Sequence, residues 1–125
     1  MKNLIITKDI VMECRRRLIA TKQDLMNRIR SSAHDFSQTE RTGDEIDQTV
    51  AQLEEHAFLV NQDRLRNQLL EIEFALSRIE LGTFGVCEET DEPIEIERLM
   101  ALPWTRLSIE GAEMREAMGR KFARI

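Results

Sequence analysis

Carboxylates gather at one point of this chain, where Asp44, Glu45 and Asp47 follow Gly43. Acidic side chains in the first turn of a helix complement the helix dipole, by ~0.3–1 kcal/mol each. The same carboxylates could also be presented, at the tip of a helical hairpin, to a basic or metal-containing site of a partner. The pattern of residue types alone leaves both interpretations open.

The other reactive side chains do not form a catalytic constellation. His34 and His56 have no serine or cysteine nucleophile in a recognisable motif beside them, and no glycine-rich phosphate loop occurs. Cys14 and Cys87 are far apart in the sequence and match neither a disulfide framework nor a metal cluster. We therefore expect a binding or regulatory protein and not an enzyme, with both cysteines buried as small apolar residues in a reducing cytoplasm.

The composition favours long exposed helices. Of the 125 residues, 33% are charged, and only 5 are glycine and 2 proline. The net charge of −5 argues against a general nucleic-acid binder, because little basic surface is left to neutralise phosphates. No apolar run approaches the ~20 residues of a membrane span, and no signal peptide opens the chain, so we expect a cytoplasmic protein without a membrane partner.

Hydrophobic periodicity predicts two long helices, over residues 8–33 and 44–81, joined by a polar turn region over 31–43. Thr42 and Glu45 resemble a capping box at the start of the second helix. The first helix has one apolar seam: Val11, Cys14, Leu18, Leu25 and Ile29. The second has one seam at Ile46, Val50, Leu53, Ala57 and Val60, and another in a shifted phase at Phe58, Leu65, Leu69, Ile72, Leu76 and Ile79.

After Gly82 the pattern changes to a turn-rich segment, followed by a terminal helix over 109–124 that contains Met114, Ala117, Met118 and Phe122. We predict an all-α protein in two parts. Residues 1–81 form an N-terminal segment and an antiparallel coiled-coil hairpin with its tip at about 34–47. Residues 82–125 form a small finger-like lobe and a C-terminal helix.

Three segments resemble the DksA/TraR family of bacterial transcription factors. Residues 44–49 (DEIDQT) are similar to the family's DxxDxA tip motif, with Thr49 in place of alanine. Residues 82–87 (GTFGVC) are similar to the G-x-[FY]-G-x-C opening of its zinc finger, and residues 92–103 match its E-x-I-x-x-x-R-L-x-A-x-P segment. The motifs are colinear and the resemblance covers residues 8–122.

The resemblance implies a concrete function. Family members bind RNA polymerase directly, without recognising a DNA sequence, and insert their coiled coil into the secondary channel. There the tip modulates open-complex stability and initiation in the stringent response. It places Asp44, Asp47 and Thr49 near the polymerase active site and makes Arg64 and Arg98 candidate polymerase contacts. We expect a monomer whose partner is RNA polymerase.

The lobe departs from the family at its zinc ligands. The four positions of the C4 pattern are Cys87, Thr90, Ser108 and Gly111, so one thiol remains where a structural zinc site wants four ligands. The chain resembles the cysteine-poor, zinc-independent subgroup, and we expect no metal. Packing must then hold the lobe together, and the candidate core residues are Phe84, Ile94, Ile96, Leu99, Leu102, Trp104 and Leu107.

A second departure concerns the alarmone ppGpp, which in responsive members binds basic side chains at the polymerase interface. The matched positions are Glu71, Leu102 and Ala112, and a carboxylate at position 71 disfavours anionic phosphates. We therefore expect ppGpp to add little to the effect of this protein.

Two alternatives stay open at the level of sequence. A transcript-cleavage-type factor also presents acids through the secondary channel, but it pairs its hairpin with a β-rich domain, and residues 82–125 are short and helical for that. A helical adaptor without a polymerase role is the second alternative.

Overall fold

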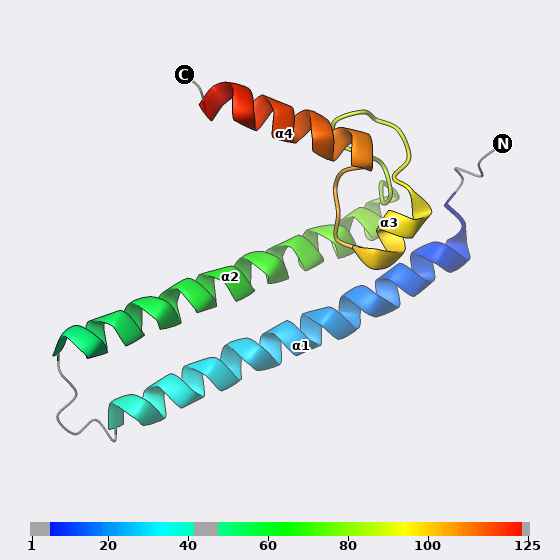
Figure 1. The fold of residues 1–125 in the computed structure, drawn as a ribbon. Helices are drawn as coiled ribbons and strands as arrows, with labels where there is room; N and C mark the ends of the chain where they lie inside the picture. Colours follow the sequence, from blue (N-terminus) through cyan, green and yellow to red (C-terminus); the bar gives the residue numbers. More distant parts are fainter. Residues whose placement is uncertain (1–5, 42–47, 124–125) are drawn as a thin grey trace. The chain divides into compact units, whose positions relative to one another are not determined.

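The computed structural model describes residues 6–41 and 48–123, which form four helices (Figure 1). The helices are α1 (Lys8–Arg41), α2 (Gln48–Leu81), α3 (Ile96–Ala101) and α4 (Ile109–Ala123). Within these ranges the only strand-type pairing is an isolated antiparallel bridge between Val86 and Pro93. The predicted all-α class is confirmed, as is the C-terminal helix.

Helix α1 begins where Thr7 caps it, since the Thr7 hydroxyl accepts the Ile10 N–H at 3.3 Å. It does not end near residue 33, and the prediction of a turn from residue 31 onward is wrong up to Arg41. The polar residues of that segment occupy mostly exposed positions of a continuing helix. Phe36 gives the extension an apolar contact, because its ring stacks on Phe58 with centroids 4.2 Å apart.

Helix α2 ends at Leu81, as predicted, through a Schellman motif. Gly82 has a φ of +78°, a conformation that favours glycine. The two backbone hydrogen bonds of the motif run from the Gly82 N–H to Ile79 O and from the Thr83 N–H to Arg78 O. The predicted helix start at residues 44–47 and the Thr42–Glu45 capping box lie outside the described residues.

The chain divides into two compact units. The lobe unit consists of residues 1–19 and 71–125, and the hairpin unit of residues 20–70. The lobe unit thus contains α3, α4 and one end of each long helix, whereas the sequence places a boundary near residue 81. That sequence boundary stays a prediction about how the protein is organised.

The hairpin unit is an antiparallel pair formed by parts of α1 and α2. Leu25 and Leu65 are buried in it, Phe36 stacks on Phe58, and the Gln62 side-chain N–H donates to Ile29 O at 3.2 Å. Gln62 is only 5% exposed, and its Oε1 has no hydrogen-bond partner among the described residues. The pair therefore buries a half-satisfied amide in the middle of its apolar seam.

Of the two seams predicted for α2, only the second is turned inward. Leu65 and Ile72 are buried, and Phe58, Leu69, Leu76 and Ile79 are half-buried. The expectation that the first seam is buried is wrong for its described members, because Val50, Leu53, Ala57 and Val60 are all exposed. The side that carries Phe58 and Leu65 takes the α1-facing position; Ile46 lies outside the described residues.

The core of the lobe unit gathers residues from α1, α2, α3 and the finger loop. It comprises Cys14, Leu18, Ile72, Ala75, Phe84, Cys87, Ile94 and Leu99. Of the predicted lobe core, Leu102 is wrong, since it is exposed at the C-terminal end of α3 while Pro103 beside it is buried. A helix of six residues can bury only one stripe, and Leu99 occupies it.

Within the described part of the chain, no helix combines the length and the apolar character that a membrane crossing requires.

Candidate functional site

The four positions that the family pattern assigns to zinc come together in the lobe unit around one sulfur atom. Cys87 is completely buried and Ser108 is 4% exposed. Ser108 caps α4, because its Oγ accepts the Gly111 N–H at 3.0 Å, and the Thr90 hydroxyl accepts the Glu92 N–H at 3.2 Å. Each hydroxyl accepts from the backbone and so keeps its own proton for the Cys87 sulfur.

Hydrogen bonding makes the Cys87 thiol unusually acidic. Burial by itself raises its pKa, but hydrogen bonds from the Ser108 and Thr90 side chains and backbones outweigh burial and lower the pKa to about 6. Cys14 shows the opposite case, since burial raises the pKa of its thiol, whose sulfur lies 3.7 Å from Leu99 O. The expectation that Cys87 is buried is confirmed, but its surroundings are polar.

Gly111 completes the cluster by its lack of a side chain. A Cβ atom at this position would overlap the Cys87 Sγ and lie 3.4 Å from the Ser108 Oγ. Structural zinc sites use cysteine, histidine or carboxylate ligands in a tetrahedron. One thiol, two hydroxyls and a glycine do not supply that set, and the described residues hold no group of three or more such ligands.

An ionic network connects α2, the finger loop and the segment before α4 within the lobe unit. Arg106 forms a two-pronged pair with Glu71, at 3.1 Å from Nε and 3.0 Å from Nη2, and its guanidinium lies 5.1 Å from the centre of the Phe74 ring. The third guanidinium nitrogen of Arg106, Nη1, lies 3.5 Å from the Glu88 carboxylate. Glu71, the residue at the matched alarmone position, is therefore already paired with a cation of its own chain.

Helix α4 is attached to the same loop by a further arginine. Arg115 lies 2.6 Å from Glu89 and 3.6 Å from Glu88, and the Glu95 carboxylate accepts the Ile109 N–H at the start of the helix. These pairs are half-exposed, so each contributes modestly to stability. Together they fix the first two turns of α4 against the finger loop.

Other arginines bind backbone carbonyls in the lobe unit. Arg98 donates to Leu107 O at 2.8 Å, so this candidate polymerase contact also braces the lobe. Arg78 donates to Trp104 O at 3.2 Å, and burial, followed by the nearby Arg106, lowers its pKa. Arg17 donates to Met100 O. Sequence reasoning missed Arg17, Arg78 and Arg106, because nothing in their spacing distinguishes them from solvated helix or loop charges.

The predicted partner-facing residues fall into two groups. Asp44 and Asp47 lie outside the described residues. Thr49 and Arg64 are exposed on α2 within the hairpin unit, and Arg64 donates to the Asn61 side chain at 2.9 Å. The structure therefore places Thr49 and Arg64 on one helix of the hairpin unit.

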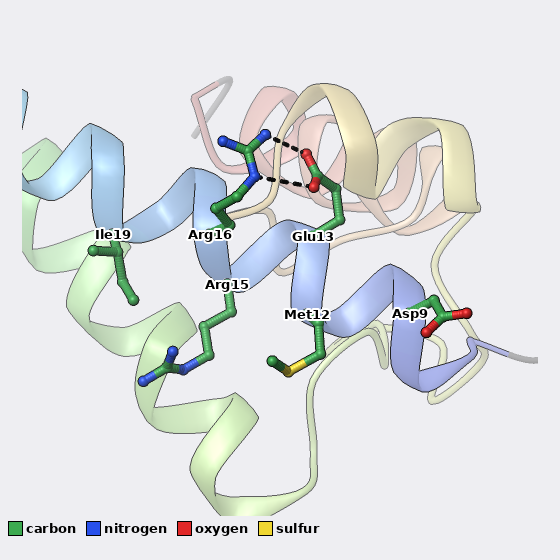
Figure 2. A pocket seen from close by; sticks show the side chains of 6 residues that line it. All are labelled: Asp9, Met12, Glu13, Arg15, Arg16 and Ile19. Atoms are coloured by element: carbon green, nitrogen blue, oxygen red, sulfur yellow. Dashed lines mark hydrogen bonds and ion pairs between the residues drawn. The ribbon is translucent and has the colours of Figure 1, made fainter.

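A shallow hollow of about 510 Å³ lies along α1 in the lobe unit, and Figure 2 shows the six side chains around it. On one side the Arg16 guanidinium donates two hydrogen bonds to the Glu13 carboxylate, from Nε at 3.1 Å and from Nη2 at 2.6 Å. Arg17 Nε donates a third hydrogen bond to the same carboxylate at 2.8 Å. These hydrogen bonds, that of Arg16 foremost, lower the Glu13 pKa to about 2. The Glu13 carboxylate is thus paired with two arginines of its own helix, and a second carboxylate, that of Asp9, also lines the hollow.

A helical hairpin with a small lobe built around a C4-type finger pattern defines a class of bacterial transcription factors, and comparisons with known proteins agree. The family model for the prokaryotic dksA/traR C4-type zinc finger matches residues 82–117. The RNA polymerase-binding transcription factor DksA of Caulobacter vibrioides is 34% identical over 103 residues, covering 82% of this chain and 72% of that protein. The chain belongs to the DksA/TraR family.

Solved structures extend the similarity to the fold. The transcription factor DksA2 from Pseudomonas aeruginosa superposes with a TM-score of 0.83 and 31% identity, over 90% of this chain and 88% of that one. The RNA polymerase binding protein and transcriptional regulator Dks of Chlamydia trachomatis shares the fold, with a TM-score of 0.53 and 20% identity. The family predicted from the tip and finger motifs is confirmed.

Proposed function

We propose that this protein binds RNA polymerase and regulates initiation by inserting its coiled coil into the secondary channel. The observation that carries the proposal is the similarity, over most of the chain, to DksA of Caulobacter vibrioides and to DksA2. In this arrangement Asp44, Asp47 and Thr49 act near the polymerase active site and change the stability of the open complex. The protein works as a cytoplasmic monomer, and it neither reads a DNA sequence nor catalyses a reaction.

The lobe of this protein holds together without zinc. The support is the donor set at the four finger positions, which offers one thiol, and the contact between Cys87 and Gly111 that leaves no room for a fourth ligand side chain. In place of a metal, hydrogen bonds from hydroxyl groups to the Cys87 sulfur, together with the Ser108 cap, join the finger loop to α4.

The alarmone adds little to this regulation. Glu71 carries a negative charge at the matched position, and it already occupies the nearest guanidinium, that of Arg106. A ppGpp phosphate approaching this surface would meet a carboxylate and a neutralised arginine.

Neither alternative is favoured by an observation. A transcript-cleavage-type factor would carry a β-rich domain after the hairpin, whereas described residues 82–123 contain two helices and one isolated bridge. An adaptor without a polymerase role has no support from the relatives that this chain matches.

The tip variant Asp44→Asn/Asp47→Asn tests the proposal. The two residues are three positions apart in the sequence, and acids near a helix start generally contribute only ~0.3–1 kcal/mol each, so the variant should fold. We expect near-normal binding to core RNA polymerase, measured by competition, and loss of most of the effect on open-complex lifetime. Unchanged regulation by this variant would show that the acids serve only as helix-start charges.

A further inference from the structure

The packing of the hairpin unit changes along its length. Leu25 of α1 and Leu65 of α2 are buried, at 4% and 2% exposure. Nearer the start of α2 this packing stops, because every position from 48 to 57 is exposed. We define the distal end of the hairpin as residues 34–41 of α1 and 48–61 of α2. None of its described side chains is buried.

A ring stack supplies the apolar contact between the two helices in the distal end. The Phe36 and Phe58 rings lie 4.2 Å apart at their centroids, with their planes inclined by 8°. Both side chains are only half-buried. The stack therefore removes less apolar surface from water than full burial would, and it stabilises the closed pair correspondingly less.

The Gln62 amide lies at the boundary of the distal end and weakens it. Its Nε2 donates to Ile29 O at 3.2 Å, but its Oε1 has no partner among the described residues. A buried acceptor without a partner loses the hydrogen bonds that water would give it. Opening of the pair at this point would return both amide atoms to water, so the closed state gains little from Gln62.

The first turns of α2 have little intrinsic helical stability of their own. Helices shorter than ~12–15 residues are marginal in water unless they pack against a partner. Thr49 and Val50 are β-branched, which lowers helix propensity, and the first turn of α2 contains no acidic residue to complement the helix dipole. Without the ring stack, these turns would not persist as a helix.

We propose that the distal end opens as a separate unit, with its boundary between Gln62 and Leu65. In the closed state the Phe36 and Phe58 rings are stacked and α2 begins at Gln48. In the open state residues 48–61 lose their helix while Leu25 and Leu65 stay packed. The hairpin is therefore a two-state device at one end and a stable pair at the other.

The opening has a consequence that rests on the proposed function. Asp44 and Asp47 directly precede α2 in the sequence, so their placement depends on whether the first turns of α2 are formed. Binding to a polymerase would then include closing of the distal end, and the ordering of this segment would reduce the affinity.

Amide hydrogen exchange of the full-length protein tests the opening. The first four amides of a helix lack intrahelical acceptors, so the comparison uses residues 52–60 and 66–76 of α2. We expect protection of 52–60 to be about 100-fold lower than that of 66–76. Phe36→Ala should lower the protection of 52–60 by about a further tenfold and leave 66–76 unchanged. Ser37→Ala, at an exposed neighbouring position, should change neither segment.

A variant of opposite sign sharpens the test. Gln62→Leu replaces the half-satisfied amide by an apolar side chain, so it should raise the protection of residues 52–60 severalfold. Equal protection along α2 in the parent protein would overturn the proposal. So would a Phe36→Ala variant in which both segments change by the same factor, because exchange would then follow the unfolding of the whole protein.

Binding of core RNA polymerase separates the opening from the proposed function. We expect Gln62→Leu to bind more tightly than the parent, by about threefold, because less of the distal end remains to be ordered. If the parent does not bind, the proposed function fails, and the exchange data still decide whether the distal end opens. Equal affinity of the two proteins, with raised protection in Gln62→Leu, would refute the link between opening and binding.

Discussion

The lobe unit and the hairpin unit handle buried polar groups in opposite ways. In the lobe unit, the polar atoms around Cys87 are all joined, through the Ser108 and Thr90 hydroxyls, and arginines bind the carbonyls of the loops. In the hairpin unit, Gln62 leaves a buried acceptor without a partner while aliphatic residues on the same helix stay exposed. A partly satisfied buried amide costs stability, whereas a fully satisfied network adds rigidity.

The difference suggests a division of work. In the lobe unit, hydrogen bonds join the loops to each other and to the helices, whereas the hairpin unit leaves aliphatic side chains of α2 exposed. Local stability in proteins commonly varies in this way, with functional surfaces at the low end. The following predictions test the contrast, from the largest expected effect to the smallest.

The largest effect is expected at Gly111. A methyl group added by Gly111→Ala would overlap the Cys87 sulfur, and overpacking of this kind costs ~1–3 kcal/mol. The matched control is Gly119→Ala on the same helix, where nothing lies within 4 Å and the gain in helix propensity is ~0.5–1 kcal/mol. Urea unfolding should show opposite signs for the two variants; equal stabilisation would mean that the lobe packs loosely.

A smaller effect of opposite sign is expected in the hairpin unit. Gln62→Leu removes the unpaired Oε1, and the Ile29 carbonyl that loses a donor lies inside α1, where helical bonding satisfies it. We expect stabilisation by about 1 kcal/mol in denaturant unfolding. Gln68→Leu, at an exposed position of α2, should change little. A loss of stability on Gln62→Leu would show that the amide is satisfied in solution.

Acid should reveal the pairing of Glu13 in the lobe unit. Its pKa of about 2 lies below the ordinary 4.5, so the stabilisation is complete above pH 4.5 and is lost as the pH falls from 4.5 to 2. The pairs with Arg16 and Arg17 are exposed, so the effect is small. The free energy of unfolding measured across this window should fall less steeply in Glu13→Gln. An identical slope would contradict the pairing.

Chelation should have no effect at all on the lobe unit. A structural zinc site contributes about 10–16 kcal/mol of binding free energy, so its removal would unfold a dependent lobe. Metal analysis of the purified protein should find no stoichiometric zinc, and EDTA should leave the melting temperature unchanged. One tightly bound zinc per chain, lost together with the fold, would refute a lobe stabilised by hydrogen bonds and packing.

Much of this protein follows from the sequence alone. Periodicity located the two long helices and the C-terminal helix, and Gly82 marked the end of α2 because glycine suits its positive φ. The seam with Cys14, Leu18 and Leu25 was identified correctly, since these residues repeat with the helical period and are all buried. The family was also recognisable, because the tip and finger motifs depend on residue type and spacing.

Tertiary contacts decided the rest. The segment 31–41 is polar, but it stays helical because Phe36 meets Phe58 across the pair. Helix α2 has two apolar seams, and no local sequence signal indicates which of them packs against α1. Nor does the sequence indicate that Gln62 is buried beside the seam that contains Leu65. Glu71, Arg78 and Arg106 make their contacts with residues that are distant in the sequence. The sequence does not distinguish a charged side chain that is solvated from one that is paired.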